Sequence, residues 1–366
     1  MALSKIDTTN MIEDVPQSKL DNNINFRNII INGDQSIAQR GTSVSAISNF
    51  SYNTVDRWRS AIDAAGTWTQ SQSTDVPSGQ GFAKSLKMDC TTANASLSAG
   101  SVLVFQQLVE GQNIQYLKKG TSSAESTTLS FWVKSNKTGT YIVEIDDTDN
   151  TRAISKSYTI SSANTWEKKT ITFEGDTTGA FNNDNGASLE LNFWLVAGTN
   201  FSSGTLQTSW ASKVDANRVV GQVNLADSTS NEWYITGVQL EAGQTASEFE
   251  FLPVDINLHR CERYFRKIGD GMGGAVNALH TMGGGTCVQP PLRANPSVSL
   301  NTTSIKVGDF YSGDYVSTSS AITLNRCTKS DVNIFINGWS TPWSAGRPIT
   351  FWGTSSGTFI SLDSEL

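Results

Sequence analysis

Histidine and cysteine are scarce in this sequence: its 366 residues include two His and four Cys. Most acid–base, nucleophilic and metal chemistry in proteins uses these side chains, so their scarcity predicts a structural or binding protein without a cofactor rather than an enzyme. The cysteines form no CxxC pair and no Cys/His cluster, and we expect buried free thiols. They are Cys90, Cys261, Cys287 and Cys327.

Long hydrophobic runs and an excess of positive charge are also missing. No segment approaches the ~18 consecutive apolar residues of a membrane-spanning helix, and the first ten residues lack the apolar core of a signal peptide. Lys and Arg number 27 against 34 Asp and Glu, a net charge of -7, whereas nucleic-acid binders usually carry a basic stripe. We therefore expect no membrane insertion, no nucleic-acid partner and synthesis in a reducing cytoplasm.

What the sequence does contain, across residues 26–252, is short runs rich in Val, Ile, Thr and aromatic residues, separated by Gly, Asn, Asp and Ser. Such runs are typical of strands, and their apolar–polar alternation leaves each strand one apolar face for a core. We predict an all-β fold in which residues 26–252 form a jelly-roll β-sandwich. The predicted strands include Asn28–Asn32, Ser101–Leu108, Thr127–Lys134, Thr140–Asp146, Trp166–Phe173, Ser188–Val196 and Trp233–Glu241.

The rest of the chain divides into four parts. Residues 1–25 are polar without a sustained period, which predicts an extended attachment arm. Residues 253–268 hold the one convincing helix pattern, starting after a proline. Residues 269–296 are a Gly- and Pro-rich connector, and residues 297–366 return to strand-like runs that predict a small β domain at the tip.

Apolar residues in the predicted helix are spaced by four, three, four and three. This is the spacing of a two-heptad seam, which predicts a short oligomeric collar. A single amphipathic helix packed on its own domain is the alternative, because sustained coiled coils need ~3–4 heptads. The seam residues are Val254, Leu258, Cys261, Phe265 and Ile268.

Two tryptophans, Trp132 and Trp194, fall on the polar faces of predicted strands. A large apolar ring at such a position needs a partner, and three are open: a stacked sugar, a neighbouring subunit, or a loop of the same domain. We take Trp132, Trp194 and the adjacent Asn192 as candidate ligand-binding residues.

No motif identifies a catalytic site. Residues 269–274 formally match GxGxxG, but this match follows a predicted helix instead of closing a strand. Carboxylates such as Glu144 and Glu190 could serve a glycosidase-like reaction, although solvated carboxylates are the usual explanation on polar strand faces. We assign no catalytic residue.

Several segments resemble a group of tailed-phage fibre proteins, many of them from marine phages. The resemblance covers residues 26–268 well and the rest loosely, and its closing motifs are the most specific. The segments are Arg27-Asn-Ile-Ile-Ile-Asn-Gly-Asp34, Gln39-Arg-Gly41, Asp56-Arg-Trp58, Thr128–Lys134, Thr138–Tyr141, Ser162–Trp166, Ile235-Thr-Gly-Val-Gln-Leu-Glu-Ala-Gly243, Phe249-Glu250, Cys261-Glu-Arg-Tyr264, Leu292–Pro296 and Leu362–Leu366.

The resemblance implies a non-enzymatic subunit of a virion fibre or spike. Such a subunit forms a homotrimer, carries a carbohydrate-binding-module-like jelly roll, and binds a host-surface glycan or receptor. Residues 1–25 would then attach it to another virion protein. Two alternatives remain: a capsid- or tail-decorating fibre with an assembly role, and a polysaccharide depolymerase.

The resemblance also implies a structural calcium, because similar jelly rolls hold one through an Asn-Gly-Asp/Glu opening and an acidic residue on the last strand. Asn32 and Asp34 keep the first part of that pattern. The chain departs from it at Gln35-Ser36, where such modules have Phe-Glu, and at Thr236-Gly237, where they have Asp. These departures weaken the expectation of calcium.

Overall fold

The computed structural model describes residues 26–268, 272–278, 281–288, 291–300, 305–309, 313–317, 321–337, 348–353 and 360–366. The predicted arm, residues 1–25, lies outside them. The chain forms two compact units, the first from Met1–Ser36 and Gly41–Leu252, the second from Ile37–Arg40 and Pro253–Leu366.

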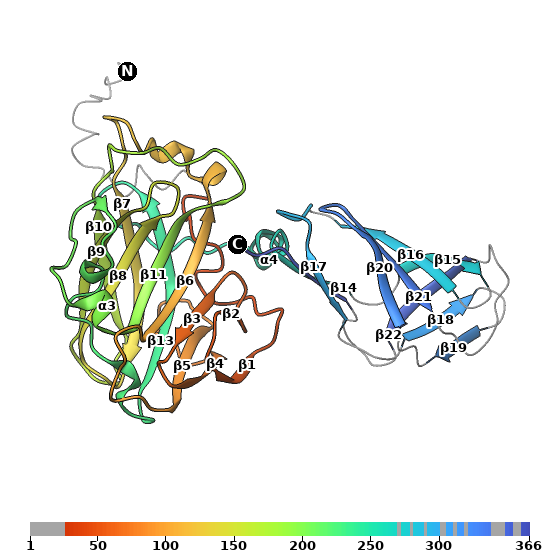
Figure 1. The fold of residues 1–366 in the computed structure, drawn as a ribbon, viewed down its shortest axis with the longest axis horizontal. Helices are drawn as coiled ribbons and strands as arrows, with labels where there is room; N and C mark the ends of the chain where they lie inside the picture. Colours follow the sequence, from red (N-terminus) through yellow and green to blue (C-terminus); the bar gives the residue numbers. More distant parts are fainter. Residues whose placement is uncertain are drawn as a thin grey trace, which may run out of the picture. The chain divides into compact units, whose positions relative to one another are not determined.

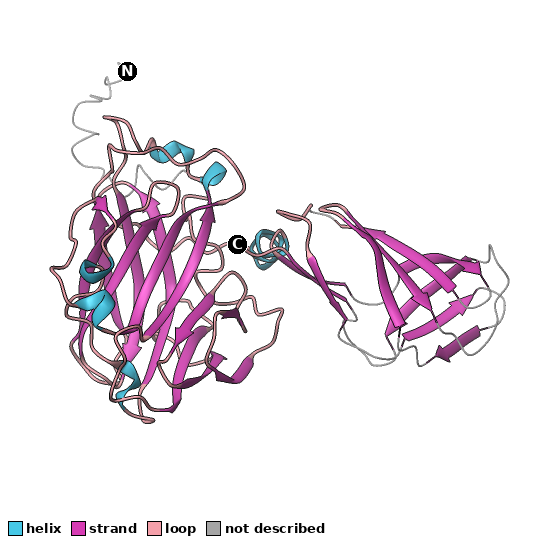
Figure 2. Ribbon diagram, viewed as in Figure 1, coloured by secondary structure: helices cyan, strands magenta, loops and turns pink. Residues whose placement is uncertain are grey.

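The first unit is an antiparallel β-sandwich of two sheets, so the predicted fold class is confirmed (Figures 1 and 2). The six-stranded sheet A has the order β1 (Ser43–Ile47), β4 (Thr67–Ser73), β5 (Ser85–Thr92), β13 (Glu232–Ala242), β7 (Thr127–Ser135) and β10 (Glu167–Phe173). The seven-stranded sheet B has the order β12 (Ala211–Ser212), β9 (Arg152–Ile160), β8 (Gly139–Asp147), β11 (Ala187–Ala197), β6 (Val102–Glu110), β3 (Arg59–Asp63) and β2 (Ser51–Tyr52).

Short helices occupy the connections of this unit, outside the two sheets (Figure 2). They are η2 (Gly111–Asn113), η3 (Gln115–Leu117), α3 (Thr199–Ser202), η4 (Asp215–Asn217) and η5 (Leu225–Asp227).

The core lies between the sheets and is built by the alternation seen in the sequence. Phe131 of β7 and Phe193 of β11 meet with ring centroids 5.1 Å apart, and both rings are fully buried. Trp58 stacks on Phe105 at 4.7 Å, and Phe105 in turn meets Trp233 at 5.9 Å. Because these residues point inward, their strand neighbours must point outward, which defines the two outer faces of the sandwich.

The predicted strand Asn28–Asn32 is wrong, since this segment is irregular. The Asn28 side-chain oxygen accepts hydrogen bonds from the backbone N–H groups of Ile30 and Leu240, at 3.0 and 3.1 Å. Asn32 has a left-handed φ of 57°. A side chain that bonds nearby backbone competes with a strand ladder, which the apolar run alone does not reveal.

In the second unit, the predicted helix of residues 253–268 is too long. Helix α4 spans Val254–Glu262, and the chain then enters strand β14 (Phe265–Ile268). Strand β14 pairs with β23 (Ile360–Asp363), which also pairs with β17 (Ser297–Leu300) on its other side. Pairing with a segment almost 100 residues away along the chain therefore overrides the local helical spacing.

The predicted connector, residues 269–296, contributes two strands to a larger sheet. These strands, β15 (Met272–Ala278) and β16 (Thr281–Cys287), pair with each other, and glycines face glycines at Gly273–Gly285 and Gly274–Gly284. A backbone ladder needs no side chains, so a Gly-rich sequence can form it. The sheet order is β19 (Gly313–Ser317), β18 (Ile305–Asp309), β22 (Pro348–Gly353), β15, β16, β21 (Asp331–Asn337) and β20 (Ala321–Cys327).

Candidate functional site

The two candidate tryptophans lie on opposite outer faces of the sandwich. Trp132 lies between the core residues Phe131 and Val133 on β7, and so points outward from sheet A. Trp194 follows the core residue Phe193 on β11, and so points outward from sheet B. One ligand cannot stack on both rings.

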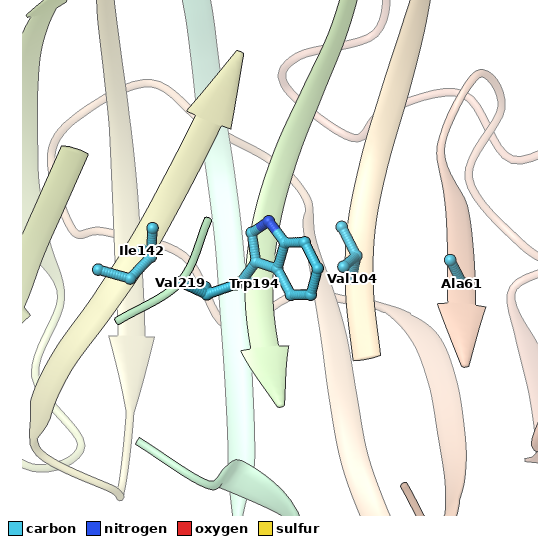
Figure 3. Packing of buried hydrophobic residues seen from close by; sticks show 5 residues of the cluster. All are labelled: Ala61, Val104, Ile142, Trp194 and Val219. Atoms are coloured by element: carbon cyan, nitrogen blue, oxygen red, sulfur yellow. The ribbon is translucent and has the colours of Figure 1, made fainter. Parts of the chain in front are cut away.

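Trp194 is covered by its own domain. Its side chain is 2% exposed and packs in a row with Ala61, Val104 and Ile142 of the neighbouring strands, with Val219 beside it (Figure 3). We call residues 198–219 the strap; it also brings the Phe201 ring to 5.4 Å from Trp194. The partner of the Trp194 ring is therefore a loop of its own domain, and Trp194 does not form an open platform for stacking a sugar.

Asn192, in the next row of the same face, is also buried at 2% exposure. It lies opposite Glu144 of β8, and its Nδ2 donates to Glu144 Oε2 at 3.2 Å. Trp194 Nε1 donates to the same oxygen at 3.1 Å. Asn192 is therefore part of a closed polar layer beneath the strap, not an exposed ligand contact.

Ion pairs hold the strap over this layer. Arg218 donates from Nε and Nη2 to the two oxygens of Glu144, at 2.7 Å each. Lys213 Nζ lies 2.7 Å from Asp146 Oδ2. Because Glu144 is fully buried and bound by Arg218 on both oxygens, it is not open to a substrate in this structure.

Two carboxyl groups of this layer have perturbed acidity. Burial, together with the nearby Glu144, raises the pKa of Asp146. Burial and the facing Asp146 likewise raise the pKa of Glu190, although Arg59 at 3.7 Å opposes the effect. Raised carboxyl pKa values suit general acids. Asp146 is covered by Lys213 of the strap, however, and Glu190 is largely buried opposite Arg59.

The outer face of sheet A is exposed along β10, whereas the outward side chains of β7 other than Trp132 are buried. Trp132 is half-buried, and its cross-strand partners are Lys168 on β10 and Thr236 on β13. Thr170 and Thr172 follow Lys168 on the same exposed side of β10. We call Trp132, Trp166, Lys168, Thr170 and Thr172 the Trp132 face.

Trp166, just before β10, is held in place by a carboxylate. Its Nε1 donates to Asp75 Oδ1 at 2.9 Å, while Lys134 bonds the other oxygen of Asp75 and lies 4.3 Å from the Tyr234 ring centroid. Burial would raise the pKa of Asp75, but the hydrogen bonds from Lys134 and Trp166 outweigh it and lower the pKa. The half-buried Trp166 ring is thus oriented by an ionised group.

The opposite half of the sheet A face is closed. Thr236 and Gln239 of β13 are fully buried. The Thr236 hydroxyl donates to the backbone oxygens of Lys84 and Asp34, at 2.8 and 3.3 Å, and Gln239 Nε2 donates to the Glu248 oxygen at 3.2 Å. The Trp132 face is therefore a partly open strip that combines aromatic rings, hydroxyl groups and one lysine, the groups that bind a hydroxylated, ring-shaped ligand.

The candidate calcium residues, Asn32 and Asp34, are bonded to protein groups. The side-chain amide of Asn32 donates to the Asp56 oxygen at 3.0 Å, its backbone oxygen accepts from Trp58 Nε1 at 3.1 Å, and Asp34 Oδ1 accepts from the Ser36 hydroxyl at 3.1 Å. Calcium needs 6–8 oxygen ligands, usually including several carboxylates. Within the described residues, no cluster of three or more His, Cys, Asp or Glu side chains could hold a metal.

The predicted seam residues do not share one helix face. Val254 on α4 is 69% exposed, Leu258 is half-buried and Cys261 is fully buried. Phe265 and Ile268 belong to β14, because α4 ends at Glu262. The continuous two-heptad seam is therefore wrong, and the exposed residues of α4 lie in its first turn and at His259.

A small pocket at one end of the sandwich is lined by Lys119, Phe181 and Trp210, among others. Its lysine is already saturated, with Asp147 Oδ2 at 2.5 Å, Asp176 Oδ2 at 3.1 Å and two backbone oxygens. This arrangement links loops of the sandwich to one another. The pocket therefore has fewer free hydrogen-bonding groups for a ligand than the Trp132 face has.

The sequence identified Trp132 as a candidate, whereas Lys168 and Trp166 were not among the predicted site residues. A signal for both was present, because the alternation in Trp166–Phe173 places Trp166, Lys168, Thr170 and Thr172 together on the polar side. Their position next to Trp132 depends on the register between β7 and β10, which the sequence does not specify. No helix among the described residues is long and apolar enough to cross a membrane.

Comparison with other proteins finds no match to a protein-family profile and none to a curated protein sequence. Solved structures that resemble part of the chain include the following three. The enzymatically active domain of tailspike protein 4 from Bacteriophage CBA120 matches at 16% identity, over 59% of this chain and 21% of that one, with a TM-score of 0.31. A CBM4 structure matches at 12% identity, over 58% and 97%, with a TM-score of 0.29.

The third is a putative sugar binding protein from Bacteroides thetaiotaomicron, at 13% identity over 59% of this chain and 99% of that one, with a TM-score of 0.30. The matched region is about a fifth of the tailspike chain. At these scores the likenesses concern the sandwich alone.

Proposed function

We propose that this chain is a non-enzymatic subunit of a virion fibre or spike that binds a host-surface glycan through the Trp132 face. The observation that carries the glycan part is the half-buried Trp132 beside the exposed Lys168, Thr170 and Thr172. An aromatic ring contacts the apolar face of a pyranose, while hydroxyl and amine groups bond its hydroxyls. The closed, ion-paired layer on sheet B favours binding over cleavage.

The glycan-binding part is tested with a glycan array and the variant Trp132→Ala. We expect this variant to lose binding at least about tenfold, since stacking rings are frequent hot spots. The matched control is Trp210→Ala, which removes another half-buried tryptophan, at the pocket with Lys119. If Trp210→Ala lost binding and Trp132→Ala kept it, the pocket would be the site and the proposed assignment would be wrong.

The virion part of the proposal follows from the resemblance to phage fibre proteins. The subunit would form a homotrimer, use residues 1–25 to attach to another virion protein, and need no cofactor. Weak single-site affinity for a glycan would then be multiplied by three copies. Deleting residues 1–25 should abolish incorporation into particles while the folded oligomer persists; particles that still incorporate the shortened chain would contradict the attachment role.

Because the predicted seam does not form one helix face, the proposed trimer contact is now limited to the first turn of α4. Val254 and Ile256 are exposed there, at 69% and 36%. Light scattering should give a trimer for the full chain and a monomer for Val254→Asp, because a buried charge opposes association. The control is Asp255→Asn in the same turn. A monomeric full chain at micromolar concentration would contradict the trimer.

A further inference from the structure

We infer that the ligand of the Trp132 face is an acidic glycan, one whose pyranose carries a carboxylate. This inference rests on the proposed function and adds the chemical class of the ligand. It starts from Lys168, which is exposed and has no carboxylate partner among the residues that the structure describes.

Lysines around Lys168 are paired, which makes its free ammonium group unusual on this sheet. Lys169, the next residue, bonds Glu167 at 2.5 Å, and Lys87 bonds Glu232 at 2.7 Å. Lys134 pairs with Asp75. Acidic residues outnumber basic ones by 34 to 27 in this chain, so carboxylates are not scarce. The sheet nevertheless leaves the lysine next to the half-buried tryptophan unpaired.

The other neighbour of Trp132 is closed by backbone. Thr236 lies opposite Trp132 on the side away from Lys168, and its hydroxyl donates to the backbone oxygen of Lys84 at 2.8 Å. A ligand on the ring therefore meets the ammonium group of Lys168 on its open side, and a free cation there favours an anion.

Register brings the ammonium group within reach of a stacked sugar. Lys168 and Trp132 are directly opposite each other in antiparallel strands, so their Cβ atoms are about 4.5–5.5 Å apart. A carboxylate on a pyranose projects from the edge of the ring, and the flexible four-carbon stem of lysine can follow it. A sulfate or phosphate ester would be better served by an arginine fork or a helix N-terminus, and the Trp132 face has neither.

The test measures binding of the full chain to oligogalacturonides, oligoglucuronides and oligomannuronides, each beside its neutral methyl ester, and to a sulfated glycan. We expect at least one carboxylated oligosaccharide to bind about tenfold more tightly than its ester, with affinity falling as salt rises. Lys168→Gln should remove this preference, so that the acid and its ester bind with equal affinity. Lys169→Gln, whose lysine is paired with Glu167, is the matched control and should keep the preference.

The outcomes separate the two proposals. Equal affinity for acid and ester, or a preference that survives in Lys168→Gln, would overturn the acidic class and leave glycan binding standing. If only the sulfated glycan bound, the proposal that the charged group of the ligand is a carboxylate would be wrong. Absence of binding to every acidic and neutral glycan would overturn the proposed function together with the inference. Circular dichroism of each variant shows whether a loss reflects misfolding.

Discussion

Arg218 and Glu144 form a two-point ion pair that fastens the strap to sheet B, with both nitrogen–oxygen distances at 2.7 Å. The Glu144 side chain is fully buried and that of Arg218 is 14% exposed. A buried carboxylate that loses its partner retains the full cost of desolvation. Removing Arg218 should therefore destabilise the strap that covers Trp194.

Replacing Arg218 with Met should lower the free energy of unfolding by about 3–5 kcal/mol, the usual cost of breaking a buried pair from one side. Denaturant unfolding measures this change. The control is Lys156→Gln, which removes an ion pair to Glu174, whose side chain is 65% exposed; we expect about 0–1 kcal/mol there. Equal effects in the two variants would mean that the strap is not held by Arg218.

Glu190 should make stability depend on pH. Its pKa is raised by burial and by Asp146, so the folded state binds its proton more tightly than the unfolded state. Stability contributed by this group is therefore lost as pH rises from its unfolded pKa, about 4.3, through the raised folded value. Glu190→Gln removes this loss, and its stability relative to the wild type should increase over that window.

Asp176 provides a control of opposite sign. Burial would raise its pKa, but hydrogen bonds from Arg152, the Thr178 backbone and Lys119 lower it. Stability from Asp176 is present above its unfolded pKa, about 3.9, and is lost as pH falls through the folded value. Chemical denaturation of Glu190→Gln and Asp176→Asn between pH 2 and 8 gives the free energy of unfolding of each variant relative to the wild type. The two differences should change with pH in opposite senses at the two sites, and equal slopes would contradict the assignment.

Gly33 should not accept a side chain. A Cβ atom there would lie 2.0 Å from the backbone oxygen of Val238, and Val238 N–H donates to the Gly33 oxygen at 2.9 Å. Gly33→Ala must therefore separate two backbone segments, at about 3 kcal/mol or more. Gly100→Ala is the matched control, because its nearest atom would be 3.9 Å away. Thermal melts that show similar losses for both would refute the close approach.

Phe265 should stabilise the second unit as a strand residue. It is buried on β14, and the Arg40 guanidinium lies 3.7 Å from the centroid of its ring. Phe265→Ala should cost about 3–5 kcal/mol, because the cavity adds to the lost burial. Calorimetry can follow the loss, with Phe26→Ala as the control, since Phe26 is 57% exposed. A loss below about 1 kcal/mol would show that this ring is not part of a packed core.

Strand alternation was sufficient to predict the sandwich, because period-two patterns reflect burial on one side. Thr127–Lys134 and Ser188–Val196 correspond to β7 and β11 within a residue at each end. Helical spacing, another local pattern, failed at Phe265 and Ile268, because these residues pair with a distant strand. Local patterns carry no information about such partners.

The site was predictable only in part, for a related reason. Alternation places Trp132 and Trp194 outward. The strap that covers Trp194 comes from residues 198–219, and no periodic pattern in the sequence predicts this contact. The pairing of Lys168 with Trp132 is a property of register.

Strand β23 lies between β14 and β17, so the small sheet of the second unit has its central strand at residues 360–363. During synthesis, β14 and β17 are made first and remain unpaired edges until that segment leaves the ribosome. Exposed edges invite pairing with other chains. A nascent chain would therefore pass through a period in which neighbouring copies on one polysome could exchange strands, so the rate of translation should affect the yield of correctly folded protein.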